Sequence, residues 1–203
     1  MPLGPRFDAA FFARPCLEVA PDLVGATLVH RLADGVRLVG RIVEVEAYLG
    51  DGSDPASHSH RGKTLRNSVM FGPPGHLYAY RSYGIHLCAN VVCEPRGHSA
   101  GVLFRALEPL EGAVRMRRLR GLPPDAPERA IASGPGRLTQ ALAITLEHNG
   151  ESLLRGALNL RQAASDDPRP EVDTSPRIGI RRGTGFLYRF YARGNACLSR
   201  RER

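Results

Sequence analysis

The chain has 203 residues, of which 42% are hydrophobic, so it is long enough to bury one substantial core. Its formal net charge of +8 favours a polyanionic partner, and Lys63 is the single lysine among 28 basic residues. No apolar run approaches the ~20 residues that span a bilayer, and the start lacks a signal-like segment. We therefore expect a cytoplasmic protein with no membrane partner.

The cysteines and histidines argue against a disulfide framework and a metal centre. No C-x-x-C pair occurs, so we expect reduced thiols at Cys16, Cys88, Cys93 and Cys197. The histidines at 58, 60, 76 and 86 do not combine into two pairs with metal-ligand spacing. The sequence predicts no metal and no cofactor.

The first elements are predicted to be an apolar arm, a short helix and a pair of strands. Residues 1–17 carry several phenylalanines and should dock on the domain. Pro21 and Asp22 are residues that the first turn of a helix favours, so a short helix is predicted there. An Ala-Asp-Gly turn then separates strands over 27–32 and 36–50.

The second of these strands ends in alternating acidic and apolar residues. Residues two apart share one face of a strand, so Glu44, Glu46 and Tyr48 point one way while the intervening valines and alanine point the other. The same alternation is also typical of an ordinary half-buried strand with a solvated polar face.

A long polar loop over 50–76 precedes a predicted β-hairpin over 76–93. Long loops in compact domains are often functional. The hairpin's outgoing arm places apolar residues on one face and His86, Cys88 and Asn90 on the other. Its tip carries Tyr83, and an exposed aromatic ring is costly unless it contacts something.

The rest of the chain alternates helices, strands and loops. Residues 101–107 should form an interior strand in which Arg105 needs an anion, because an unpaired buried guanidinium costs several kcal/mol. The other predicted segments are a helix that begins at 108–112 and ends at Gly121, a helix over 133–144, a surface loop over 163–176, β-like segments at 177–180 and 186–192, and a frayed tail over 196–203.

A series of short motifs closely resembles the alkyladenine (3-methyladenine) DNA glycosylase family. Each is weak alone, but together, in this order, they cover almost the whole chain. The motifs are Gly40–Gly50, Ala56-Ser57-His58, Thr64–Asn67, Met70–Gly75, Tyr78-Ala79-Tyr80, Tyr83-Gly84, Cys88-Ala89-Asn90, Leu103–Gly112, Ser133–Ile144, Pro176–Ile180 and Arg189–Asn195.

The resemblance implies a single α+β domain over 1–203 with a curved, mainly antiparallel sheet, flanking helices and a protruding β-hairpin. It also implies a monomeric DNA repair glycosylase that acts on double-stranded DNA, and that is nucleoid-associated if the source is bacterial. Such an enzyme flips alkylated or deaminated purines out of the duplex and hydrolyses the N-glycosidic bond.

The resemblance also assigns roles to particular residues. Glu46 would activate the attacking water, and Arg105 would anchor both water and carboxylate. Tyr83 would intercalate where the base has left. The base pocket would be formed by Tyr48, His58, Tyr80, Asn90 and Leu103. The DNA backbone would be contacted by Arg61, Lys63, Arg66 and Arg137.

The chemistry predicts a monofunctional enzyme that leaves an abasic site. Glu44 and Glu46 lie on one strand face about 6.6 Å apart by strand rise, so they cannot straddle a glycosidic bond. Alkylated purines are good leaving groups, so one carboxylate suffices. A lyase step needs an activated amine, and Lys63 has no evident setting that would lower its pKa.

Three departures from the family pattern affect these assignments. One extra residue lies between Leu49 and His58, so His60 is the alternative to His58 in the base pocket; Leu65 replaces a usual proline; and Ala196-Cys197 replaces a proline-aromatic pair. Two alternatives are a nucleic-acid binder without catalysis, of DNA or structured RNA, and a small-molecule nucleosidase. The sequence does not rank 3-methyladenine, 7-methylguanine, hypoxanthine and ethenoadenine as substrates.

Overall fold

A long strand, β2 (Arg37–Tyr48), lies at the centre of the computed structural model, which describes residues 2–200. Strand β5 (Gly101–Glu111) pairs with β2 along most of its length. On its other edge, β1 (Thr27–Arg31) pairs with the first half of β2 and β8 (Arg189–Ala192) with the second half. Every residue from Ile42 to Ala47 is buried, because strands flank this part of β2 on both edges.

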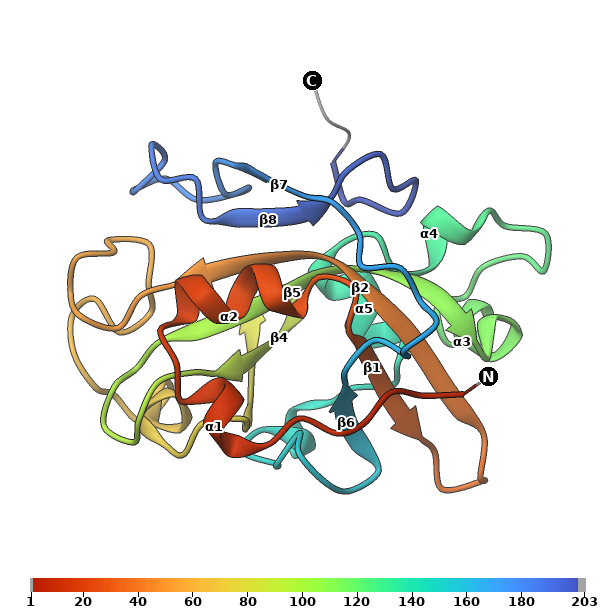
Figure 1. Ribbon diagram of the computed structural model, residues 1–203, viewed down its shortest axis with the longest axis horizontal. Helices are drawn as coiled ribbons and strands as arrows, with labels where there is room; N and C mark the ends of the chain where they lie inside the picture. The colour runs from red at the N-terminus through yellow and green to blue at the C-terminus, as the bar shows by residue number, and fades with distance from the viewer. Residues whose placement is uncertain (1, 201–203) are drawn as a thin grey trace.

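The sheet is antiparallel throughout and curls on itself (Figure 1). Its main strand order is β3-β4-β5-β2-β1-β6, and β7 joins it through β8. The remaining strands are β3 (Leu77–Ser82), β4 (His86–Val92), β6 (Leu158–Arg161) and β7 (Val172–Ser175). With the flanking helices, this is the single compact α+β domain with a curved antiparallel sheet that the sequence predicts.

Short helices cover the apolar face of the sheet. Helix α2 packs on β2 and β5, and α5 packs on β4 and β5 (Figure 1). The helical segments are α1 (Ala9–Phe12), α2 (Cys16–Leu23), α3 (Ala113–Leu119), α4 (Glu128–Ala132), α5 (Pro135–Ala141) and the 3₁₀ turns η1 (Ser68–Phe71) and η2 (Leu146–His148). Among residues 2–200, no helix has the length and apolarity that crossing a membrane requires.

The alternation of the strands separates core from site. Val45, Phe104 and Val91 belong to the hydrophobic core, while their neighbours Glu46, Arg105 and Asn90 lie on the opposite face. The N-terminal arm packs into the same core through Phe7 and Phe12, as predicted. The core therefore supports one face of the sheet and leaves the other for the site.

The predicted helix start at residues 108–112 is wrong. Strand β5 continues to Glu111, because it stays paired with β2 as far as Val39. Gly112 then adopts a left-handed φ of +80° and precedes α3. A Cβ atom there would lie 2.7 Å from the carbonyl oxygen of Arg37, so the chain turns here at glycine.

Other boundaries also differ from the predictions. Pro21 lies in the last turn of α2 rather than its first turn. Part of the predicted loop over 163–176 forms β7, while residues 177–180 form no strand. The segment 197–199 of the tail is packed rather than frayed: Cys197 and Leu198 are buried, and both the Ser199 amide and hydroxyl donate to Glu44. Residues 201–203 lie outside the described part.

Candidate active site

The carboxylate of Glu46 is fully buried and is held by three donors. Its Oε1 accepts the backbone N–H of Ile178 at 2.7 Å and lies 3.3 Å from Nη1 of Arg105. Its Oε2 accepts the hydroxyl of Tyr48 at 2.8 Å. A carboxylate offers about four acceptor positions, so one position is left for a further donor such as water.

Glu44 is buried beside Glu46, but its surroundings are different. Its Oε1 accepts Nε of Arg189 at 2.6 Å and Nε of Arg105 at 3.2 Å, and Ser199 contributes an amide at 2.6 Å and a hydroxyl at 2.8 Å. The register between β2 and β5 shifts on both sides of Glu44, an irregularity that often re-aims side chains near active sites. Glu44 is therefore fully occupied within the protein.

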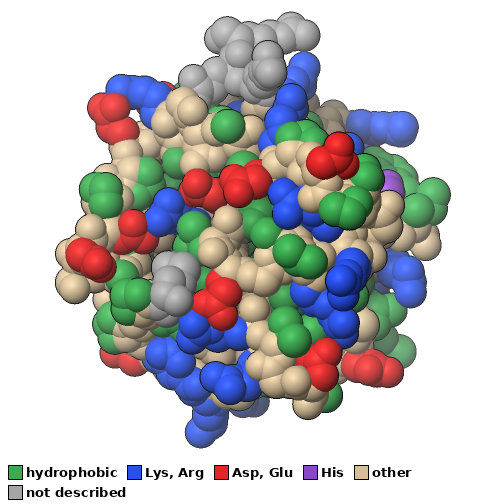
Figure 2. All heavy atoms as spheres, turned by 90° about the vertical axis from the view of Figure 1, so that its right-hand side faces the viewer, with side chains coloured by type: hydrophobic (Ala, Val, Ile, Leu, Met, Phe, Trp, Pro, Cys, Tyr) green, Lys and Arg blue, Asp and Glu red, His purple; other side chains and the backbone are tan. Residues whose placement is uncertain are grey.

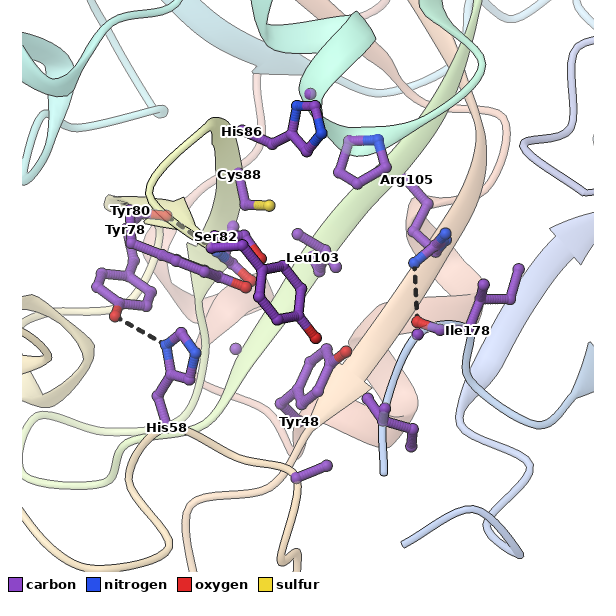
Figure 3. A pocket seen from close by; sticks show the side chains of 18 of the residues that line it. Tyr48, His58, Tyr78, Tyr80, Ser82, His86, Cys88, Leu103, Arg105 and Ile178 are labelled. Carbon is purple, nitrogen blue, oxygen red and sulfur yellow. Dashed lines mark hydrogen bonds between the residues drawn. The ribbon is translucent and has the colours of Figure 1, made fainter. Parts of the chain in front are cut away.

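Arg105 links the two carboxylates, which are the anions that its buried guanidinium was predicted to need. Burial alone lowers the pKa of its guanidinium, but the charges of Glu46 and Glu44 outweigh burial and raise it. Its Nη1 also donates to the carbonyl of Ile178 at 3.3 Å (Figure 3). The cation stays charged and fixes both Glu46 and the segment that follows Arg177.

A cavity of about 810 Å³ opens beside this cluster. Glu46 itself does not line the cavity; its partners Tyr48, Arg105 and Ile178 form the wall in front of it. The cavity is also lined by His58, Met70, Tyr78, Tyr80, Cys88, Asn90, Leu103, Gly134 to Arg137, and Gly179 to Arg182, among others. All five residues of the predicted base pocket lie in this lining.

Aromatic rings face one another across the cavity. Figure 3 shows Tyr48 on one side and Tyr80 with His58 on the other. The His58 and Tyr80 ring centroids are 4.3 Å apart, and Nδ1 of His58 shares a 3.0 Å hydrogen bond with the Tyr78 hydroxyl. Burial raises the pKa of Tyr78 to about 12, and burial together with Glu46 raises that of Tyr48 well above its ordinary value. Both phenols are therefore neutral donors at pH 7.

These contacts favour His58 over His60 as the histidine of the base pocket, an assignment that stays a prediction. His58 lines the cavity and His60 does not, although both side chains are exposed to solvent. Residues 51–53 are exposed at the preceding bend, where a surface loop tolerates an extra residue. Asn90 is oriented by its Nδ2, which donates to the carbonyl of Tyr78 at 3.0 Å.

The connection between β3 and β4 presents two large apolar side chains to solvent. Tyr83 is 79% exposed and Ile85 is 73% exposed. Tyr83 has a φ of +50°, a conformation that few bulky residues adopt. Residues held in such sparsely populated conformations cluster at functional sites. Tyr83 also borders the cavity.

Two of the four predicted DNA-backbone residues lie at the cavity. Arg61, Lys63, Arg66 and Arg137 are all exposed, and Arg66 and Arg137 line the cavity. Gly136 lets α5 approach the hairpin closely, since a Cβ atom there would lie 3.1 Å from Cβ of His86. The described residues contain no group of three or more His, Cys, Asp or Glu side chains that could hold a metal ion.

A profile of the family described as "Methylpurine-DNA glycosylase (MPG)" matches residues 10–196. The chain belongs to the methylpurine-DNA glycosylase family. It is therefore a DNA glycosylase, a hydrolase of N-glycosyl bonds, and the family predicted from the sequence is confirmed.

Relatives of this methylpurine-DNA glycosylase family member match over almost their whole length. A protein of Rhodopseudomonas palustris (strain BisB18) is 50% identical over 98% of this chain and 92% of its own. One from Chlorobaculum tepidum is 49% identical over 97% and 92%, and one from Nitrosospira multiformis is 52% identical over 93% and 91%. All three carry the name "Putative 3-methyladenine DNA glycosylase".

Sequence reasoning about this glycosylase missed a second buried ion pair behind Tyr48. Arg177 and Asp54 have fully buried side chains joined by hydrogen bonds of 2.5 and 2.7 Å. Nη1 of Arg177 also donates to the carbonyl of Ala47, and its guanidinium lies 4.5 Å from the Tyr48 ring centroid. Arg177 also has apolar neighbours in the sequence. The argument used for Arg105, that a buried guanidinium needs an anion, could therefore have predicted a carboxylate partner for Arg177.

Proposed function

We propose that this glycosylase flips alkylated or deaminated purines out of double-stranded DNA and hydrolyses their N-glycosidic bond with a water activated by Glu46. The product is a free base and an abasic site. The observation that carries the proposal is Glu46 itself: a fully buried carboxylate, paired with Arg105, directly behind the wall of an aromatic cavity.

The cavity suits a flipped purine. A base between Tyr48 on one side and Tyr80 with His58 on the other gains stacking worth about 1–3 kcal/mol per ring, and a cationic alkylated base gains a cation–π attraction as well. Asn90 and Leu103, which pair in register on neighbouring strands, form part of the wall. We assign Asn90 the rejection of normal guanine through a clash with its exocyclic amino group.

Extrusion of the base costs a few kcal/mol, which Tyr83 offsets by filling the gap in the stack. The ring's 79% exposure supports this role, because nothing in the described protein covers it. Arg61, Lys63, Arg66 and Arg137 then hold the phosphates around the flipped nucleotide.

Hydrolysis requires a water near the sugar carbon and negative charge near the developing oxocarbenium ion. The free acceptor position of Glu46 takes the water's proton, and its charge stabilises the cationic sugar. Arg105 pairs with the carboxylate and keeps it oriented. Glu44 is saturated by its own partners, so a single carboxylate performs the chemistry.

Replacement of Glu46 by Gln tests the proposal. Base release from duplexes carrying 3-methyladenine, 7-methylguanine, hypoxanthine or ethenoadenine should fall by about 10²–10⁴-fold, the usual contribution of a general base. Binding to the same duplexes should persist. The matched control is Glu18→Gln, because Glu18 is exposed on α2. If the wild type releases none of these bases, the proposed hydrolysis is wrong. If it instead releases bases from free nucleosides at a rate independent of salt, it is a nucleosidase.

The absence of a lyase step is tested separately. Lys63 is exposed and lies 5.6 Å from the Phe71 ring centroid, with no buried setting that would turn its ammonium into a nucleophile. Borohydride reduction during turnover should trap no covalent protein–DNA adduct, and the abasic strand should stay uncut. A trapped adduct that disappears in Lys63→Ala would show a bifunctional enzyme instead.

A further inference from the structure

Leu65 is 98% exposed although its loop is firmly held. The buried side chain of Asn67 accepts the backbone N–H of Thr64 at 2.6 Å and donates to the carbonyls of Gly62 and His58, each at 3.0 Å. The same asparagine thus fixes the backbone that carries His58 into the base cavity. The hydrogen-bonded loop therefore holds Leu65 in solvent. An apolar side chain gains no stabilisation from such exposure unless a partner covers it.

Leu65 borders a groove on the side of β3 away from the base cavity. This outer groove, about 580 Å³, is lined by Leu65, Arg66, Arg81, Tyr83, Leu146 and neighbouring atoms. Tyr83 and Arg66 line both the outer groove and the base cavity. Tyr83 therefore lies between the base cavity and the outer groove, and the proposed mechanism uses only the base cavity.

The outer groove is cationic on the side of β3 and of the loop that carries Leu65, while its other side, at Leu146 and Asn149, also carries the exposed Glu147. Residues 55–93 contain no Asp or Glu, and in this stretch Lys63, Arg66 and Arg81 are exposed around the leucine. Arg66 is fixed to the neighbouring strand through a 2.9 Å hydrogen bond to the carbonyl of Arg81. The face seen in Figure 2 differs, since acidic and basic side chains are interspersed there.

An apolar tip inside a cationic margin matches the minor groove of DNA, where deoxyribose edges are apolar and phosphates line both sides. We propose that Leu65 is a second apolar contact to DNA, seated in the minor groove on the far side of Tyr83 from the flipped base. This inference rests on the proposed function. When a base enters the cavity and Tyr83 fills its place, the outer groove faces the duplex that remains stacked.

The first test measures affinity for a duplex with a stable abasic-site analogue, so that no turnover interferes. Leu65→Ser should weaken binding about tenfold, as expected for a leucine that is buried on binding. The slope of log affinity against log salt should not change, because the side chain is uncharged. Arg81→Ala should reduce that slope by about 0.9. The matched control is Val114→Ser, since Val114 is 65% exposed on α3 and lines neither hollow.

The second test locates the contact. All four native cysteines are buried, so Leu65→Cys introduces a uniquely accessible thiol. The Leu65→Cys thiol should form a disulfide with a thiol tether attached to a guanine N2 in the minor groove beside the abasic analogue. Placing the tether first on one strand and then on the other identifies the strand that residue 65 contacts. Val114→Cys is the background control.

Affinity of Leu65→Ser within twofold of wild type, or cross-linking of Leu65→Cys no greater than background, overturns the inference. If either of these results is found while the wild type still binds the duplex and releases the damaged base, only the Leu65 contact is refuted and the proposed function stands. A wild type that binds no duplex and releases no base refutes the proposed function itself.

Discussion

His58 shows how a single side chain is tuned by its position at the cavity mouth. Partial burial lowers the pKa of its imidazole below the ordinary value, and the nearby positive charge of Arg66 lowers it further. The ring is therefore mostly uncharged at pH 7, as the proposed stacking on a cationic purine requires. Its hydrogen bond to Tyr78 also fixes the ring against Tyr80.

We predict that His58 titrates below pH 6.5 in an NMR titration. Because the folded chain binds this proton less readily than the unfolded chain, the contribution of His58 to stability is complete above about pH 6.5 and is lost as the pH falls through the window beneath it. His30 also has a pKa lowered by burial, so the difference between wild type and His58→Gln isolates the effect. A titration midpoint at or above 6.5 contradicts the prediction.

Among the elements, the segment over 176–188 organises the site although it contains no helix or strand. Its Ile178 amide and carbonyl hold Glu46 and Arg105, and its Arg177 supports the back of the Tyr48 ring. Burial alone lowers the pKa of Arg177, but Asp54 outweighs burial and raises it, so the guanidinium stays charged. The segment is held to the loop over 50–56 by this ion pair.

Arg177→Met should lower the free energy of unfolding by about 3–5 kcal/mol, because it leaves the buried Asp54 carboxylate unpaired. Adding Asp54→Leu should restore part of the loss, since the double variant buries no charge. Urea denaturation measures both changes. Arg181→Met, an exposed position in the same segment, should change stability by no more than about 0.5 kcal/mol. Equal losses in the single and double variants would show that the ion pair is not the cause.

At the scale of the whole molecule, the net charge of +8 is distributed unevenly. The acid-free stretch 55–93 lies against the cavity mouth, whereas basic and acidic residues are interspersed over the face in Figure 2. Several surface arginines are already paired with carboxylates, including Arg41 with Glu108 and Asp167. Cations without such partners are the ones available to phosphates.

Duplex binding should weaken linearly in log salt, with a slope of about −0.9 per phosphate contacted. Lys63→Ala and Arg137→Ala should each reduce the magnitude of this slope by about 0.9, whereas Arg31→Ala, on β1, should leave it unchanged. Fluorescence anisotropy over a range of salt concentrations measures the slopes. The monomeric state also stays a prediction, which light scattering would check. A slope that neither Lys63→Ala nor Arg137→Ala changes would place the DNA elsewhere on the surface.

Strand positions were predictable where the signal is local. The alternation over 40–50 correctly placed Glu46 and Tyr48 on the face opposite the valines, and the hairpin pattern placed Cys88 and Asn90 on the cavity side. The helix predicted to begin at 108–112 does not begin there, because β5 continues to pair with β2 as far as Glu111 and this pairing outweighs the local helix propensity. Likewise, β7 was missed because a short polar strand exists only through its pairing with β8.

The sequence by itself determined the family and the faces of the strands, since each follows from short motifs or a two-residue period. It also named five residues that line one cavity, whose role in binding a base stays a prediction. Only the tertiary structure shows why Glu46, to which the resemblance assigned the water, keeps an acceptor position while Glu44 does not. Glu44 and Glu46 are equivalent in the alternation, but Arg189 and Ser199, more than 140 residues away in the chain, saturate Glu44. Such contacts are set by how the sheet folds back on itself, and no local pattern encodes them.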